Sequence, residues 1–144
     1  GKAASLAALR DSFPIPPWFT VSPEAFWLSL GEESKHDLET LTNADDIQEV
    51  LKILRPHDEV IKEIEQALAS QNCERVAVRS SALDEDGAIH SFAGQLESYL
   101  YVSSREVAAR VVDVWKSGFS ERVLLYRQEA GLALIPSPPA VLIQ

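Results

Sequence analysis

The chain has 144 residues, of which 46% are hydrophobic and 24% are charged, a composition typical of one globular domain with a single core. Its 13 basic and 22 acidic residues leave a net charge of −9, which argues against a domain that binds nucleic acid through clustered cations. A single cysteine, Cys73, excludes an internal disulfide and a multi-cysteine metal site. The sequence shows neither the apolar run of about 18 residues that a membrane span needs nor a signal-like leader, so we expect a cytoplasmic protein.

The two ends of the sequence suggest a piece of a longer protein. The chain contains no methionine, so no initiator residue precedes Gly1. At the other end, residues 140–144 form an apolar run that predicts a buried strand. Natural domains usually end outside their sheet. We therefore expect the chain to be a fragment.

The N-terminal segment alternates between helix and extended chain. Residues 2–10 are strong helix formers with leucines at helical spacing, so they predict a helix. Three prolines within residues 13–17 require extended backbone, and residues 18–21 continue as a strand. Ser22 followed by Pro23 predicts the start of a helix, because serine caps helices and proline suits the first helical position. The side chains expected on the buried face of this helix are Phe26, Trp27 and Leu30.

Most of the negative charge lies in residues 31–70, which carry 11 acidic and 4 basic side chains. Asn43 predicts the N-cap of one helix that ends before Pro56, and a second helix follows. The apolar stripes of these helices consist of Ile47, Val50, Leu51 and Leu54, then Val60, Ile61, Ile64, Ala67 and Leu68. Two interpretations of the charge remain open: solvated faces of surface helices, or a docking surface for a partner.

The C-terminal half mixes strands and helices. Residues 75–78 and 99–102 are β-rich runs. Ser103 with Glu106 three residues later forms a capping box, and residues 121–130 predict a further helix that ends at Gly131. The buried positions expected on the helix after the capping box are Val107, Val111, Val114, Trp115 and Phe119. Helices and strands are mixed along the chain, so the fold class is α/β or α+β, of which we predict α+β.

Residues 79–95 form a long polar segment that directly follows a predicted strand. Such long segments within a compact domain are either functional or disordered. Arg79 supplies a fork-shaped cation suited to phosphate. Further donors that phosphate oxygens require are available from Ser80, Ser81, Ser91 and the backbone near Gly94. The segment matches neither the P-loop nor the dinucleotide-binding pattern, so a phosphate site and a structural loop both remain open.

The order of several motifs resembles the nucleotide-binding domain of the phosphoenolpyruvate synthase and pyruvate phosphate dikinase family. The motifs that carry the resemblance are GKAASL at 1–6, PPWFTVS at 16–22, VRSSA at 78–82, ED at 85–86, SFAGQ at 91–95, YLYV at 99–102 and VLIQ at 141–144. This resemblance implies an ATP-grasp fold, of which residues 1–144 would form the first, incomplete subdomain. It implies a parent enzyme that uses ATP and Mg²⁺ to phosphorylate a carrier histidine and then pyruvate.

The same resemblance implies roles for individual residues. Lys2 would pair with the ATP phosphates, Arg79 would contact the transferring phosphates as the catalytic residue, and Gln144 would border the adenine. The glycine-rich loop that covers the phosphates would contain Ser91, Phe92, Ala93 and Gly94. The resemblance also implies that the carboxylate and amide that hold Mg²⁺ lie outside residues 1–144. The adjacent acids of residues 84–86 are not expected to form a metal site, because they cannot converge on one ion.

Two departures and two alternatives accompany the resemblance. The family commonly has glycine where this chain has Ala3 and Trp18, and the alanine is expected to stiffen the backbone around Lys2. The parent could instead be a rifampin phosphotransferase or a glucan dikinase, which share the nucleotide half. It could also be a non-catalytic interaction module that docks a partner through the acidic helices. The expected partners are ATP, the rest of the nucleotide-binding domain, a phosphohistidine domain and a second copy of the parent.

Overall fold

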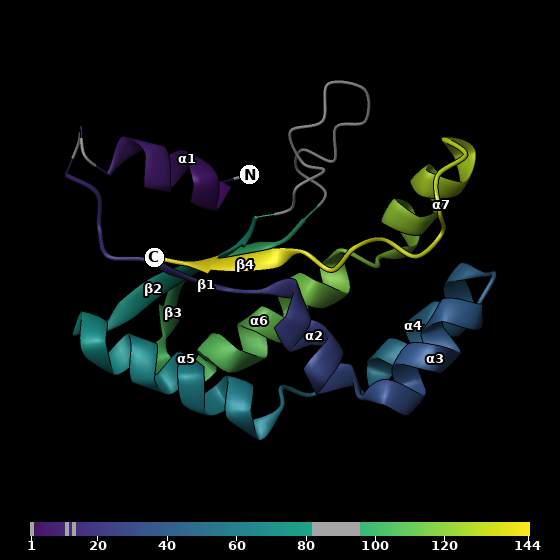
Figure 1. Cartoon of the computed structure of the whole chain (residues 1–144), viewed down its shortest axis with the longest axis horizontal. Helices are drawn as coiled ribbons and strands as arrows, with labels where there is room; N and C mark the ends of the chain where they lie inside the picture. The colour runs from purple at the N-terminus through teal and green to yellow at the C-terminus, as the bar shows by residue number, and fades with distance from the viewer. Residues whose placement is uncertain (1, 11, 13, 82–95) are drawn as a thin grey trace.

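A computed structural model describes residues 2–10, 12, 14–81 and 96–144, and it shows a mixed α+β architecture around one antiparallel sheet (Figure 1). The strands are β1 (Phe19–Val21), β2 (Arg75–Ser81), β3 (Ser98–Ser103) and β4 (Ala140–Ile143), and their order across the sheet is β1-β4-β2-β3. The α+β class predicted from the sequence is confirmed.

The last strand lies in the interior of the sheet. β4 pairs with β1 on one side, Val21 opposite Val141, and with β2 on the other, Ser80 opposite Val141. Residues 141–143 are at most 1% exposed. An apolar run buried on both faces is what an interior strand requires, so the buried strand predicted at 140–144 is confirmed, with Ala140–Ile143 as its bounds.

Helices cover the two faces of the sheet unequally (Figure 1). On one face lie α2 (Pro23–Leu30), α5 (Asp58–Gln71) and α6 (Val107–Ser117), and on the other lies α1 (Lys2–Leu9). The helices α3 (Glu32–Thr40), α4 (Ala44–Lys52) and α7 (Glu121–Glu129) gather at one side of the α2–α6 layer. The main hydrophobic core therefore lies between the sheet and α6.

Aromatic side chains form the centre of this core. The Phe26 ring stacks on Phe119 with 5.1 Å between centroids and meets Trp115 edge-on at 5.8 Å. All three side chains are fully buried, as the helical spacing predicted. Trp18 and Trp27 are only half-buried, so among the tryptophans Trp115 alone is a fully buried anchor.

Local capping chemistry explains some of the helix starts, and among the described helices side-chain caps occur at α4, α5 and α7. The Asn43 side chain accepts a 2.9 Å hydrogen bond from the Asp46 N–H at the start of α4, as predicted. The Ser103 hydroxyl donates to the Glu106 carboxylate at 2.5 Å and opens a 3₁₀ turn, Ser104–Glu106, that leads into α6. Ser22 stands at the N-cap of α2, but its side chain accepts no hydrogen bond from that helix.

Two elements differ from the sequence-based expectation. β2 extends to Ser81 and is three residues longer than the predicted 75–78, because Ser80 and Ser81 remain paired with β4. α3 had no predicted counterpart, because Leu38 is the one buried residue in this acidic helix and no apolar stripe reveals it.

Candidate functional site

The alternation of β2 separates its polar residues onto two faces. Val78 and Ser80 face the main core, where Ser80 is 1% exposed, and Arg79 and Ser81 lie on the opposite face, the side of α1. Arg79 is half-exposed and stands within the strand, whereas the sequence placed it in the polar segment after the strand. Ser80 is therefore removed from the set of candidate phosphate donors, because it cannot share a face with Arg79.

One hydrogen bond brings the N-terminal helix to this face. The Ala3 N–H donates to the Ser81 Oγ at 3.1 Å, across a sequence separation of 78 residues. Lys2 begins α1 and is half-buried, so Lys2 and Ala3 are helical rather than part of a loop. Ser81 and Arg79 are two residues apart on one side of a strand, about 7 Å along it. The structure thus places the lysine and the arginine of the proposed phosphate site at the same end of the sheet.

Ser81, Arg79 and Ala77 of β2, with their partners in β4, form a strip on the α1 face of the sheet, and Gln144 lies at its other end. Its backbone exchanges two hydrogen bonds with Ala77, of 2.7 and 3.0 Å. Ala140, four residues earlier, pairs with Ser81, so about 13 Å of β4 separates Gln144 from the Lys2 end. The two ends of the strip are therefore far enough apart to contact different parts of one ligand.

A β-bulge shapes the surface beside Gln144. The pairing of β2 with β3 shifts after Val76, and Tyr101 has a φ of 57°, which is rare for a bulky residue. The Arg75 Nη1 donates to the Tyr101 carbonyl at 2.9 Å and so holds the bulge. Leu100 and Tyr101 are 65% and 76% exposed. A groove of about 260 Å³ results, lined by Arg75, Val76, Ala77, Leu100, Tyr101 and Gln144.

The titratable groups with shifted pKa values serve packing and capping. Burial raises the pKa of Tyr99, and the negative charges of Asp113 and Glu97 raise it further. The Arg110 guanidinium lies 5.0 Å from the centre of the Tyr99 ring and also bonds Asp113 at 2.8 Å. Tyr99 pairs with Val78, on the core face, so this group joins β3 to α6 and lies on the face opposite Arg79.

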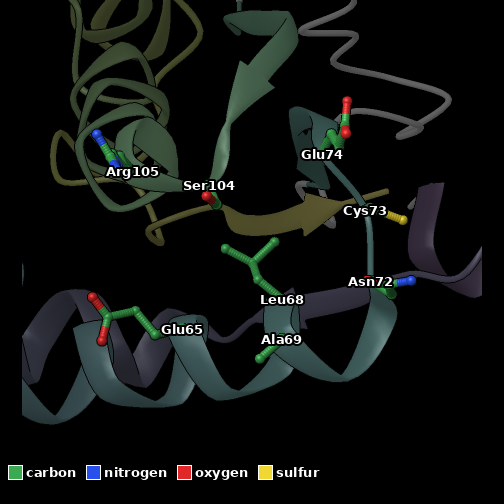
Figure 2. A pocket seen from close by; sticks show the side chains of 8 residues that line it. All are labelled: Glu65, Leu68, Ala69, Asn72, Cys73, Glu74, Ser104 and Arg105. Carbon is green, nitrogen blue, oxygen red and sulfur yellow. The ribbon is translucent and has the colours of Figure 1, made fainter.

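A second hollow, of about 380 Å³, lies at the end of α5 (Figure 2). The Leu68 side chain points into it, whereas the charged ends of Glu65, Glu74 and Arg105 point in different directions. Cys73 is half-buried there and donates to the Gln71 carbonyl at 3.4 Å. The side chains around this hollow do not converge on a common point, so it has no arrangement suited to a small ligand.

The remaining candidates fall outside the described residues. These are Ser91, Phe92, Ala93 and Gly94 of the glycine-rich loop, together with residues 84–86. Within 2–10, 12, 14–81 and 96–144, no group of three or more His, Cys, Asp or Glu side chains is placed to hold a metal ion. None of the helices in these ranges is long and apolar enough to cross a membrane.

With this geometry established, comparison with known proteins identifies the family. The model of the pyruvate phosphate dikinase AMP/ATP-binding domain matches residues 1–144. The chain belongs to this family. The resemblance inferred from the motifs is therefore confirmed, and the α+β architecture is that of part of an ATP-grasp-like nucleotide-binding region.

Named relatives match most or all of the chain at moderate identity. The chain is 36% identical over 92% of its length to rifampicin phosphotransferase from a Streptomyces species, and 35% identical over 88% to the prodigiosin synthesizing transferase PigC from Serratia marcescens. It is 32% identical over its full length to phosphoenolpyruvate synthase from Aeropyrum pernix. The chain spans 17%, 14% and 20% of these relatives, respectively. It is thus an AMP/ATP-binding domain of the dikinase type, in a family of transferases.

Proposed function

We propose that residues 1–144 form the first part of the ATP site of a cytoplasmic dikinase-type phosphotransferase, with phosphoenolpyruvate synthase as the parent enzyme. In that reaction ATP, pyruvate and water yield phosphoenolpyruvate, AMP and phosphate through a phosphohistidine. The observation that supports the proposal is the strip on the α1 face of the sheet. It carries Lys2 and Arg79 at one end and Gln144 at the other.

The chemistry of this strip suits phosphoryl transfer. Such transfer depends on positioning and on neutralising charge at the phosphates, more than on covalent help from the protein. Arg79 offers a permanent fork of donors, and Lys2 offers a point charge from the adjacent helix. The Gln144 backbone ends the strip beside the Leu100–Tyr101 groove, where an adenine ring would find apolar surface. When bound, Mg²⁺ would supply further positive charge at the phosphates, and its ligands are proposed to lie outside residues 1–144.

Substitution of Arg79 tests the proposal directly. In the full-length gene product, Arg79→Ala is expected to weaken ATP binding by about 1.5–3 kcal/mol, or roughly 10- to 150-fold, because a charge-assisted hydrogen bond to phosphate is lost. Isothermal titration with Mg²⁺-ATP measures this change. The matched control is Arg105→Ala, which removes an exposed arginine from the 3₁₀ turn after β3. Equal ATP affinity in wild type and Arg79→Ala would remove Arg79 from the site, and no ATP binding in either would refute the ATP site itself.

The phosphate acceptor distinguishes the parent enzymes. The identities to rifampicin phosphotransferase (36%) and to phosphoenolpyruvate synthase (32%) are close, so a parent that phosphorylates rifampin or a glucan is the alternative. Release of AMP from ATP by the full-length protein is measured with pyruvate, rifampin or glucan as acceptor. Pyruvate-dependent AMP release supports the proposal, and release with another acceptor alone assigns the parent to that acceptor. ATP-independent partner capture by the acidic helices would favour an interaction module.

A further inference from the structure

We propose that Ser81 is a positioning residue for the ATP phosphates, because its hydroxyl holds the first turn of α1 and thereby places Lys2 at the Arg79 end of the strip. This inference rests on the proposed ATP site and deepens it. The evidence is the 3.1 Å hydrogen bond from the Ala3 N–H to the Ser81 Oγ.

The need for this contact follows from the sequence of α1. The first N–H groups of a helix have no partner within the helix, and a Ser, Thr, Asn or Asp side chain at the N-cap usually accepts from one of them. The residue before α1 is Gly1, which has no side chain. Ser81 instead supplies the acceptor from a strand 78 positions away. This tertiary hydrogen bond thus replaces a local N-cap.

The packing of α1 makes this contact important. α1 has eight residues and none of them is buried, and Leu9 at its end is 43% exposed. An isolated helix of this length is marginal in water, so its position depends on the few contacts it makes with the sheet. Ser81, by contrast, is 7% exposed and is fixed in β2 by its pairing with Ala140. The strand is therefore the rigid partner, and the helix takes its position from it.

The hydrogen bond acts on Lys2 through one peptide unit. Lys2 and Ala3 are consecutive, so fixing the Ala3 N–H fixes the backbone from which the lysine side chain extends. Loss of the acceptor would leave the charge of Lys2 intact but would no longer hold it beside Arg79. Ser81 consequently differs from a residue that contacts phosphate directly, because its effect must vanish when Lys2 is absent.

A double-mutant cycle in the full-length gene product tests this. We compare wild type, Ser81→Ala, Lys2→Ala and the double variant by titration with Mg²⁺-ATP and with AMP, which lacks the outer phosphates. Ser81→Ala is expected to weaken ATP binding about three- to tenfold, the range for one neutral hydrogen bond, and to change AMP binding less than twofold. In the Lys2→Ala background, the same substitution should cause no further loss. Ser81→Thr keeps the hydroxyl and should restore the affinity for ATP.

The matched control is Ser29→Ala. The Ser29 Oγ also accepts a backbone N–H, that of His57, at 3.1 Å, but it joins α2 to the start of α5 on the other face of the sheet. It should change thermal stability about as much as Ser81→Ala and leave ATP affinity unchanged. A loss of ATP affinity that persists without Lys2, or that Ser29→Ala reproduces, would overturn the positioning role while leaving the ATP site in place. Absence of ATP binding in wild type would instead refute the proposed function.

Discussion

The contact between α6 and the segment leading into β4 provides a stability prediction that the structure defines closely. Gly118 ends α6 with φ −66° and ψ −15°, a conformation that alanine adopts without strain. A Cβ at this position would lie 2.9 Å from Pro139 Cδ, 3.3 Å from Pro139 Cγ and 3.3 Å from the Trp115 carbonyl. Because alanine adopts this backbone conformation without strain, a loss of stability in Gly118→Ala would come from packing.

Two opposing effects set the magnitude. Overpacking against the rigid proline ring costs about 1–3 kcal/mol. In the opposite direction, alanine lowers the conformational entropy of the unfolded chain, which stabilises the folded domain by about 0.4–1 kcal/mol. With the midpoints of the two ranges, Gly118→Ala should destabilise the domain by about 1.3 kcal/mol, which for a chain of this size lowers the Tm by about 4 °C. Urea unfolding followed by circular dichroism measures the free energy of unfolding, and calorimetry measures the Tm.

A second substitution identifies the cause. Pro139→Ala removes the clashing ring atoms, so Gly118→Ala should cost much less in that background, with a coupling energy of about 1 kcal/mol. The contrasting control is Gly131→Ala. Gly131 has a φ of 68° and open space around its missing Cβ, so its cost of about 1–2 kcal/mol comes from the backbone and should not depend on Pro139. A neutral Gly118→Ala, or a loss unchanged by Pro139→Ala, would refute the packing argument.

Two further predictions concern helix caps. Asn43→Ala should destabilise the domain by about 1 kcal/mol in urea unfolding, because the Asp46 N–H loses its acceptor. Asn43→Ser should cost far less, because serine is also a good N-cap. Equal losses in the two variants would show that the cap is not the cause. The second prediction is a pH dependence. Hydrogen bonds from Ser103 lower the pKa of Glu106 below its ordinary 4.5. The stability that these bonds provide is therefore complete above pH 4.5 and is lost as the pH falls through the lower pKa of the folded state. Wild type should therefore exceed Ser103→Ala in Tm at pH 7, and the difference should shrink at pH 3; a constant difference would contradict the assignment.

Signals that lie within a few residues of one another were predictable. The Asn43 cap and the stop at Gly131 are short-range patterns of hydrogen bonding or backbone conformation, and the structure shows both. The Ser103–Glu106 box forms only in part, because Glu106 accepts from Ser103 but the Ser103 side chain accepts no hydrogen bond from the helix. The Gly131 and Leu132 N–H groups bond the carbonyls of Gln128 and Arg127, which is the glycine-dependent helix ending that the sequence indicates. α3 escaped prediction for the same reason, because a helix with one buried residue leaves no periodic signal.

The candidate site shows the limit of local patterns. The chemical suitability of Lys2, Arg79 and Gln144 was inferred from residue types and family resemblance, and the family is confirmed. Their arrangement along one face depends on the length of β2 and on its pairing with β4. A strand three residues longer than predicted moved Arg79 into the sheet and turned Ser80 toward the core.

The sequence by itself determined the α+β class, the capped helices, the buried character of the last strand and the family to which the domain belongs. Only the tertiary structure decided that this strand lies inside the sheet, that the bulge at Tyr101 opens a groove beside Gln144, and that Ser81 anchors α1. The physical reason is the sequence separation over which each kind of interaction acts. Caps and periodic stripes act over one or two helical turns, whereas strand order and the Ala3–Ser81 hydrogen bond join segments far apart in the chain. No local pattern encodes which distant group will accept a hydrogen bond from an N–H that has no local partner.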